Sequence, residues 1–186
     1  INVIDIKNML IGVTINIEMT WKDLRLSYRN LVPGISNLVD HEDFERLWLP
    51  LDYVVHLNAI IGSIHKEASR MVTISSNKTQ LNMDLYNSYD DLIFDGEEVS
   101  LKIKQRFRLD YTCLFDLTKY PFDQQRCEFI MFIRSTFSRG IALLENHLYK
   151  KAVVYSGWET VGQFEIINTT LGIRTNDKNN YTTMLR

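Results

Sequence analysis

The only two cysteines of the chain enclose a short loop with an aromatic apex. Cys113 and Cys127 stand at the ends of CLFDLTKYPFDQQRC, with Tyr120, Pro121 and Phe122 near its middle. Such a pair can form a disulfide, ligate a metal ion, or do neither. Zinc is poorly supported, because a structural zinc site usually has four ligands that include a closely spaced cysteine pair. The proline fixes its own φ and extends the residue before it, so the apex should be a rigid turn that presents two aromatic rings.

Three N-glycosylation sequons bear on the redox environment of these cysteines. They begin at Asn77, Asn168 and Asn180, and each match alone is weak evidence. Together they favour a secreted or cell-surface chain, where oxidising conditions permit disulfides. A disulfide between Cys113 and Cys127 is therefore favoured over a metal site. In the chain-entropy model, closing a loop of this length stabilises a fold by about 3 kcal/mol.

Residues that could support catalysis are not arranged for it. The four histidines show no zinc-protease spacing, and His41-Glu42 lacks a second histidine four residues further on. Asp90-Asp91 and Glu97-Glu98 would point to opposite strand faces, so neither pair could act as an acid and a base. No Ser-His-Asp set or glycine-rich phosphate loop stands out. We therefore expect no enzyme, no cofactor and no metal site.

The length and composition predict one globular domain. A chain of 186 residues buries about 68 to 70% of its unfolded surface, which allows a sizeable core. A net charge of -2 offers no electrostatic footprint for nucleic acid, so no nucleic-acid partner is expected. No apolar run reaches the roughly 18 to 20 residues that span a bilayer, and the start INVIDIKN lacks a signal-peptide pattern. The chain is therefore expected to be soluble and already processed, or to be a fragment. The ending YTTMLR favours a fragment, because it resembles a strand that stops in mid-course.

Two stretches alternate between apolar and polar residues with the period of a β-strand. Val13 to Trp21 is apolar at every second position, which predicts a half-buried antiparallel strand. Val99 to Cys113 alternates in the same way over 15 residues, with Gln105 as the exception on the apolar side. Each stretch should have one buried and one wet face.

Turn residues separate several shorter elements. Asp95-Gly96 follows Leu92–Phe94 and should form a hairpin with the strand that begins at Val99. Residues 127–133, CEFIMFI, are apolar on both faces and predict a central strand covered on both sides. Further strands are expected over 47–57, 71–75, 152–155, 161–167 and 181–185, one helical turn over 41–46, and a surface loop over 76–91. Trp21, Trp48 and Trp158 should fill the core. The result is an all-β, immunoglobulin-like β-sandwich of about ten strands.

The cysteine loop resembles, in spacing and in residue types, that of the Cys-loop family of pentameric ligand-gated ion channels. Other motifs of the family follow in order. WKDLRL at 21–26 resembles its W-x-D-x-R-L strand, LWLP at 47–50 its (I/L)-W-x-P segment, and GWETVG at 157–162 the stretch before its ninth strand. Arg186 falls where the family has the basic residue that leads into its first membrane helix. The similarity covers nearly the whole chain.

The resemblance implies an extracellular ligand-binding domain over residues 1–186. The family's N-terminal helix and most of its first strand would be missing, and its membrane domain would follow residue 186. It implies a pentameric ring of identical or homologous subunits at the plasma membrane, with a small-molecule agonist bound between neighbours. It also implies no cofactor. The segment PFDQQRC is nearest the nicotinic branch, in a divergent form like that of invertebrate receptors.

The resemblance also indicates where an agonist would bind. The complementary side of the family's pocket comes from the wet faces of the two alternating strands, here Asn16, Glu18, Arg106 and Arg108. The principal side would come from Tyr53 or His56, from the 134–139 stretch, and from a capping hairpin near 168–181. The candidates in the last two are Arg134, Ser135, Phe137, Ile173, Arg174 and Tyr181. An aromatic box for a quaternary amine is mostly missing, so an amine is not favoured over an apolar or anionic ligand. Each charged strand residue could equally be a solvated position.

Coupling to a membrane domain would pass through the loop apex and the first turn. The candidates are Asp5, Lys7, Tyr120, Pro121, Phe122, Asp123 and Arg186. Ile6 stands where the family often has an acid that pairs with the basic residue near Arg186, which puts that pairing in question.

Three other functions remain open at this stage. A chemosensory receptor of the chemotactile kind, tuned to poorly soluble molecules, would have the same architecture and would explain the missing aromatic box. A secreted binding protein with this fold and no pore would buffer a ligand, although it would have no use for an apolar apex. An unrelated adhesion sandwich would require the order of the motifs to be accidental.

Overall fold

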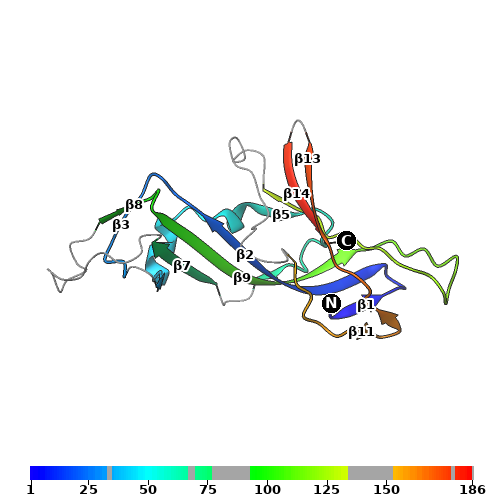
Figure 1. The fold of residues 1–186 in the computed structure, drawn as a ribbon. Helices are drawn as coiled ribbons and strands as arrows, with labels where there is room; N and C mark the ends of the chain where they lie inside the picture. The colour runs from blue at the N-terminus through cyan, green and yellow to red at the C-terminus, as the bar shows by residue number, and fades with distance from the viewer. Residues whose placement is uncertain (33–34, 67–69, 77–92, 134–152, 177–178, 186) are drawn as a thin grey trace. The chain divides into compact units, whose positions relative to one another are not determined.

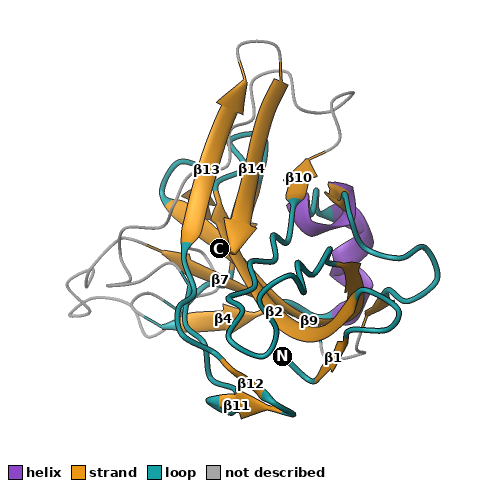
Figure 2. Ribbon diagram, turned by 90° about the vertical axis from the view of Figure 1, so that its right-hand side faces the viewer, coloured by secondary structure: helices purple, strands orange, loops and turns teal. Residues whose placement is uncertain are grey.

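The fold is built almost entirely from β-strands. The computed structural model describes residues 1–32, 35–66, 70–76, 93–133, 153–176 and 179–185. Within them lie 14 strands and two short 3-10 helices, η1 (His41–Arg46) and η2 (Pro50–Tyr53). Figure 2 shows how little of the described chain is helical. The predicted all-β sandwich class is confirmed, with more and shorter strands than the ten expected.

The largest sheet contains both strands that were predicted from alternation. Its order is β1 (Val3–Asp5), β2 (Leu10–Trp21), β9 (Val99–Thr112), β7 (Met71–Ser76) and β4 (Ser36–Leu38), and β6 (His65–Lys66) also pairs with β9 (Figure 1). On β9 every odd-numbered residue is buried, and every even-numbered one is exposed or half-buried. Gln105 is buried with its apolar neighbours, so strand parity decided its position despite its polar side chain.

Four antiparallel pairs make up the remaining strands. They are β3 (Ser27–Arg29) with β8 (Ile93–Asp95), β5 (Val54–His56) with β10 (Met131–Ile133), β11 (Thr160–Val161) with β12 (Phe164–Glu165), and β13 (Leu171–Asn176) with β14 (Asn179–Leu185). The last pair forms the hairpin that the sequence predicts near 168–181.

The described chain divides into two compact units. Unit 1 comprises Ile1–Ile15, Asp52–Lys66 and Phe107–Arg186, and unit 2 comprises Asn16–Leu51 and Glu67–Arg106. The two longest strands, β2 and β9, contribute residues to both units.

The WKDLRL motif lies in unit 2, where the contacts of its side chains show its structural role. Asp23 is buried, and Arg25 donates to its two carboxylate oxygens, from Nε at 2.8 Å and from Nη2 at 2.6 Å. These hydrogen bonds hold the pKa of Asp23 below its usual value. Trp21 and Leu26, on either side of this pair, pack against a core of Tyr28, Leu31, Ile74, Phe94, Val99 and Leu101. The charged pair thus closes a turn whose apolar flanks belong to the core.

Unit 1 has an aromatic core at the other end of β9. Phe107 and Tyr111 are buried on the inner face of the strand, and Phe129 lies against Tyr111 with ring centroids 4.8 Å apart. Ile11 and Val13 of β2 are buried in the same unit. The alternation of both strands therefore supplies the core.

The prediction of a hairpin at Asp95-Gly96 is wrong about which strand pairs with β8. A turn does follow β8, since the Glu98 N–H donates to the Asp95 carbonyl oxygen at 2.9 Å, but β8 pairs with β3 and not with β9. Gly96 is buried, and a Cβ there would collide with the carbonyl oxygen of Asp23 and lie 2.9 Å from that of Leu26. The glycine serves close packing against a distant turn, which local sequence cannot reveal.

Other predicted elements are shorter or different. The strand expected over 127–133 is reduced to β10, and residues 153–155 of the strand expected over 152–155 form none. The strand expected over 47–57 is η2 followed by β5. Trp158, expected in the core, is 82% exposed. The loop expected over 76–91 lies, beyond Ser76, outside the described residues.

In the part of the chain that the structure describes, no helix has the length and apolar character needed to cross a bilayer.

Candidate functional site

The cysteine loop is closed by the expected disulfide. Cys113 is bonded to Cys127 with their Cα atoms 5.4 Å apart, and the loop is drawn in yellow-green beyond the end of β9 in Figure 1. We call residues 113–127 the disulfide loop. The Cys113 N–H also donates to the Met9 carbonyl oxygen at 2.9 Å. The loop is therefore anchored both covalently and to the turn between β1 and β2.

That turn holds two of the predicted coupling residues. Asp5 accepts hydrogen bonds from the backbone N–H and the side-chain amide of Asn8, at 3.0 and 2.7 Å, and these bonds lower its pKa. Met9 adopts a positive φ of 57° at the end of the turn, and Lys7 is exposed. The structure thus brings the Asp5–Met9 turn beside the disulfide loop, where the sequence predicts that both would act.

The apex of the loop presents its aromatic rings to solvent. Phe122 is 89% exposed and Tyr120 is 58% exposed, and the peptide bond between Tyr120 and Pro121 is cis. The Tyr120 N–H donates to the Leu117 carbonyl oxygen at 3.1 Å, and the Phe122 N–H to that of Lys119 at 2.8 Å. The apex is thus a hydrogen-bonded turn with outward rings, as the sequence predicts.

Gln125 joins the two sides of the disulfide loop through its side chain. Its Oε1 accepts from the Asp116 N–H at 2.9 Å, and its Nε2 donates to the Asp116 carbonyl oxygen at 2.7 Å. The same Nε2 also donates to the carboxylate of Asp123. One amide side chain therefore reproduces the two hydrogen bonds of a strand pair and fixes Asp123 next to the apex. The sequence analysis did not single out Gln125, because its role depends on which backbone lies opposite.

The wet face of β2 and β9 carries the predicted complementary residues. Asn16, Glu18, Arg106 and Arg108 are all exposed. Glu18 forms ion pairs with two lysines of β9, Lys102 at 2.7 Å and Lys104 at 2.9 Å. We call Glu18, Lys102, Lys104 and Arg106 the strand face, since all four belong to unit 2.

The sequence analysis did not name Lys102 and Lys104 as members of this face, although the strand pattern indicates them. They occupy even-numbered positions of β9, like Arg106, and so share its face. Both lysines pair with Glu18, and Arg106 occupies the next even-numbered position of β9. These four residues comprise three cations and one acid.

His56 does not lie where the sequence predicts. It is buried in unit 1, its Nδ1 lies 2.7 Å from the Tyr111 hydroxyl, and its ring faces Phe107 with centroids 5.7 Å apart. Burial lowers the pKa of His56, and the positive charge of Lys66 adds to the effect. This imidazole is a polar part of the core, because its neighbours on β9 are buried aromatic residues, and it is not available as a ligand contact.

The other principal-side candidates are only partly described. Tyr53 is half-buried at the end of η2. In the hairpin, Ile173 pairs with Thr182, Arg174 with Tyr181, and Thr175 with Asn180. Asn168 is exposed just before β13. Arg134, Ser135, Phe137, Asn77 and Arg186 lie outside the described residues.

Among the residues that the structure describes, no three His, Cys, Asp or Glu side chains are grouped so that they could hold an ion.

Comparison with known proteins gives a consistent result. Residues 1–185 match the family model described as neurotransmitter-gated ion-channel ligand binding domain. The chain is 26% identical over 117 residues to the acetylcholine-gated chloride channel subunit acc-2 of Caenorhabditis elegans. The matched segment covers 62% of this chain and 22% of the relative. Identity is 27% over 121 residues with the gamma-aminobutyric acid receptor subunit theta of Mus musculus, covering 65% and 15% of the two chains. It is 28% over 120 residues with the beta-4 subunit of the same receptor type in Gallus gallus, covering 64% and 20%. The matched part therefore spans between 15% and 22% of the length of these relatives.

Replacing Gln125 by alanine should destabilise the disulfide loop. The change removes two hydrogen bonds to the Asp116 backbone, so we expect the free energy of unfolding to fall by about 1 to 2 kcal/mol. Urea unfolding followed by near-ultraviolet circular dichroism measures it. Gln124→Ala is the matched control, because Gln124 is the exposed neighbour, and it should change stability by less than about 0.5 kcal/mol. Equal effects of the two substitutions would contradict the role of Gln125.

The buried His56 should make stability depend on pH. Its folded pKa lies below the unfolded value of about 6.5, so the unfolded chain binds the proton more readily. The contribution is fully present above about pH 6.5 and is lost as the pH falls, by up to about 1.4 kcal/mol per pH unit. Urea unfolding between pH 8 and pH 5.5 tests this. His56→Asn should flatten that slope, whereas His65→Asn, at an exposed histidine, should retain it. A His56→Asn slope equal to that of the wild type would refute the assignment.

Proposed function

Since this chain belongs to the neurotransmitter-gated ion-channel ligand-binding domain family, we propose that it binds an agonist between neighbouring subunits and thereby gates an ion pore. Members of the family are ligand-gated channel receptors and not enzymes. The proposed assembly is a pentamer of identical or homologous subunits. The proposed location is the extracellular side of the plasma membrane, attached through a transmembrane domain.

The observation that carries this proposal is the exposed apex of the disulfide loop. Phe122 is 89% exposed although its loop is held by a disulfide, by Gln125 and by the hydrogen bond to Met9. A large apolar ring held rigidly in water is unfavourable unless it meets a partner. In the proposed receptor that partner is the membrane domain, and Asp5, Lys7, Asp123 and Arg186 share the coupling role.

The strand face supports a complementary half-site for the agonist. Its three cations and one acid favour an agonist with a carboxylate or another anionic group, since a purely cationic ligand would meet a repulsive face. Arg106 is proposed as the main contact, because an arginine can donate two parallel hydrogen bonds to a carboxylate. Asn16, in the same unit, is proposed to belong to this half-site, and Arg108 stays a candidate ligand contact predicted from sequence.

In this proposal the principal half-site lies on the neighbouring subunit and is formed by a different set of residues. Tyr53 and the backbone of the β13–β14 hairpin, with Ile173, Arg174 and Tyr181, are its described members. Arg134, Ser135 and Phe137 complete the set predicted from sequence. Glycans at Asn77, Asn168 and Asn180 are also proposed.

Gating follows from a difference in affinity between two states. An agonist favours the open state only by as much as it binds that state more tightly. The disulfide loop suits the transmission of such a bias, since its ends are covalently tied and its apex is a rigid knob.

Substituting Arg106 should weaken the response to an agonist that carries a carboxylate. The test uses the full-length subunit in oocytes, with gamma-aminobutyric acid and acetylcholine, the transmitters in the relatives' names, as probes. We expect gamma-aminobutyric acid to be the better agonist. Arg106→Ala should raise its half-maximal concentration by about tenfold or more, as the loss of roughly 1.4 kcal/mol implies. Arg29→Ala, at an exposed arginine on β3, is the control and should leave the curve in place. An unchanged curve in Arg106→Ala would remove the half-site.

Substituting Phe122 should impair gating while binding is retained. Phe122→Ala removes the ring that would be buried against the membrane domain. Burying such a ring contributes about 1.5 to 3 kcal/mol of free energy. We expect the maximal current to fall severalfold, while agonist binding to the same receptors stays within about twofold. Leu114→Ala, also exposed but at the base of the loop, is the control. Normal currents in Phe122→Ala would argue against docking of the apex.

A further inference from the structure

A cavity of about 820 Å³ lies in unit 1 against the inner side of the disulfide loop. Its walls come from Ile4 of β1, Ile11 of β2, the disulfide loop from Tyr120 to Cys127, Phe129, and residues 163–170. None of these residues belongs to the strand face, whose members are in unit 2. The cavity is therefore separate from the half-site proposed for the agonist.

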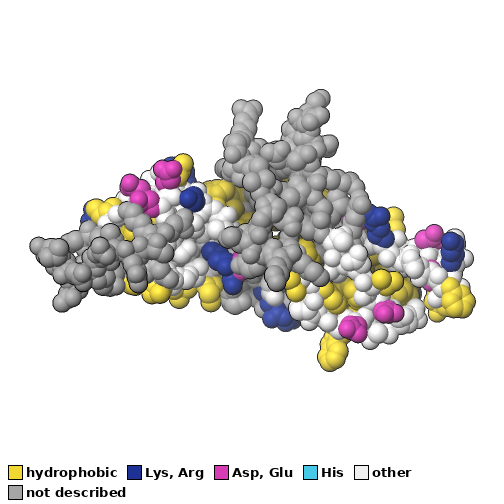
Figure 3. Space-filling model, viewed as in Figure 1, with side chains coloured by type: hydrophobic (Ala, Val, Ile, Leu, Met, Phe, Trp, Pro, Cys, Tyr) yellow, Lys and Arg dark blue, Asp and Glu magenta, His cyan; other side chains and the backbone are white. Residues whose placement is uncertain are grey.

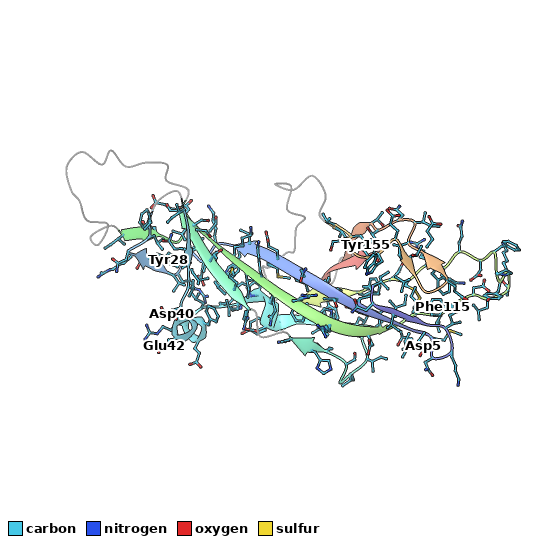
Figure 4. All side chains as sticks on the ribbon, turned by 90° about the horizontal axis from the view of Figure 1, so that it is seen from below. Asp5, Tyr28, Asp40, Glu42, Phe115 and Tyr155 are labelled. Carbon is cyan, nitrogen blue, oxygen red and sulfur yellow. A yellow bond between two sulfur atoms is a disulfide. The ribbon has the colours of Figure 1, made fainter. Side chains whose placement is uncertain are left out.

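The floor of the cavity is apolar and well packed. Ile11, Phe115 and Phe129 are buried there. The rings of Phe115 and Phe164 are stacked with centroids 6.2 Å apart, which holds the β11–β12 hairpin against the base of the disulfide loop. Figure 4 shows Phe115 beside that hairpin. Water on such a floor finds few hydrogen-bonding partners, so an apolar occupant is favoured over water.

The rim of the cavity carries exposed side chains of both kinds, since the polar residues Gln124, Gln163 and Asn168 line it as well as apolar ones. Ile167 is 75% exposed, and the rings of Tyr120 and Phe122 stand at the opening. In the view of Figure 3, hydrophobic side chains, in yellow, are scattered among charged and other groups over the described residues. A molecule that enters would therefore pass a mixed polar and apolar rim and meet apolar surface at the floor.

The polar groups around the cavity do not favour either sign of charge. Asp123 accepts a hydrogen bond from Gln125, and Arg126 pairs with Glu128 at 3.4 Å. Glu165 contributes one further acid to the lining. Both signs are present and several of these groups are already engaged within the chain, so a charged ligand gains little there.

We propose that this cavity binds a small, neutral, predominantly apolar molecule. Its volume lies within the roughly 300 to 1,000 Å³ of pockets that enclose such ligands, and its walls combine an apolar floor with a few amide and hydroxyl groups at the edge. The occupant would touch the inner side of the disulfide loop. A modulatory effect on gating rests on the proposed function, whereas the binding itself does not.

The test measures binding of the neutral fluorescent probe N-phenyl-1-naphthylamine to the chain of residues 1–186. We expect saturable binding of one probe per chain with enhanced fluorescence. The anionic analogue 1-anilinonaphthalene-8-sulfonate has the same rings and should bind at least about tenfold more weakly. Tighter binding of the anionic analogue would overturn the neutral class of ligand.

Two substitutions locate the probe. Ile166→Trp fills the cavity from its wall, and Thr169→Trp narrows it from a half-buried edge position that does not belong to the core. Each should weaken probe binding by at least about tenfold. Thr169→Trp keeps the test valid if Ile166→Trp does not fold. Ile61→Trp, at a residue of the same unit that is 98% exposed and does not line the cavity, is the control and should bind as the wild type does.

The outcomes separate this inference from the proposed function. Absence of saturable binding, or binding unchanged by both cavity substitutions, would overturn the inference and leave the proposed function standing. Arg106→Ala should leave probe binding unchanged. Loss of the agonist response in that variant with normal probe binding would show that the two sites are independent.

Discussion

The bond between Cys113 and Cys127 is the constraint on which the arrangement of unit 1 depends. It fastens the end of β9 to the segment that leads into β10, so the residues between them form a closed loop. The hydrogen bond from Cys113 to Met9 adds the turn after β1 to the same anchor. Gln125 then pairs the two sides of the loop internally. Without the disulfide, these hydrogen bonds would not hold a segment of this length in place. Each one stabilises the fold only modestly in water, whereas ordering the segment costs conformational entropy.

The anchored loop creates the two features that bear on function. It holds Phe122 in solvent at a fixed place, and its inner side closes a cavity over Ile11 and Phe115. A domain that acts alone gains no stability from either feature, since both leave apolar surface in contact with water. In the proposed receptor the ring would contact the membrane domain, and the proposed cavity site would adjoin the same loop.

Strand alternation allowed much of the fold to be predicted, because it is a local property. It placed β2 and β9, their buried faces and the exposed positions of Glu18 and Arg106. Pairing between distant strands could not be predicted in the same way. Asp95-Gly96 resembles a hairpin locally, but Gly96 packs against the carbonyl oxygen of Asp23 and β8 pairs with β3. Trp158 is likewise exposed, although its residue type favours a core.

The sequence by itself determined the all-β class, the family, the disulfide loop and the outward rings at its apex, because cysteine spacing, strand parity and proline act over a few residues. Only the tertiary structure decided that Glu18 holds Lys102 and Lys104, that His56 is buried against Tyr111, and that a cavity lies behind the loop. These features depend on which side chains become neighbours when strands far apart in the sequence pair. That choice is made by the packing of the whole core and not by any one segment.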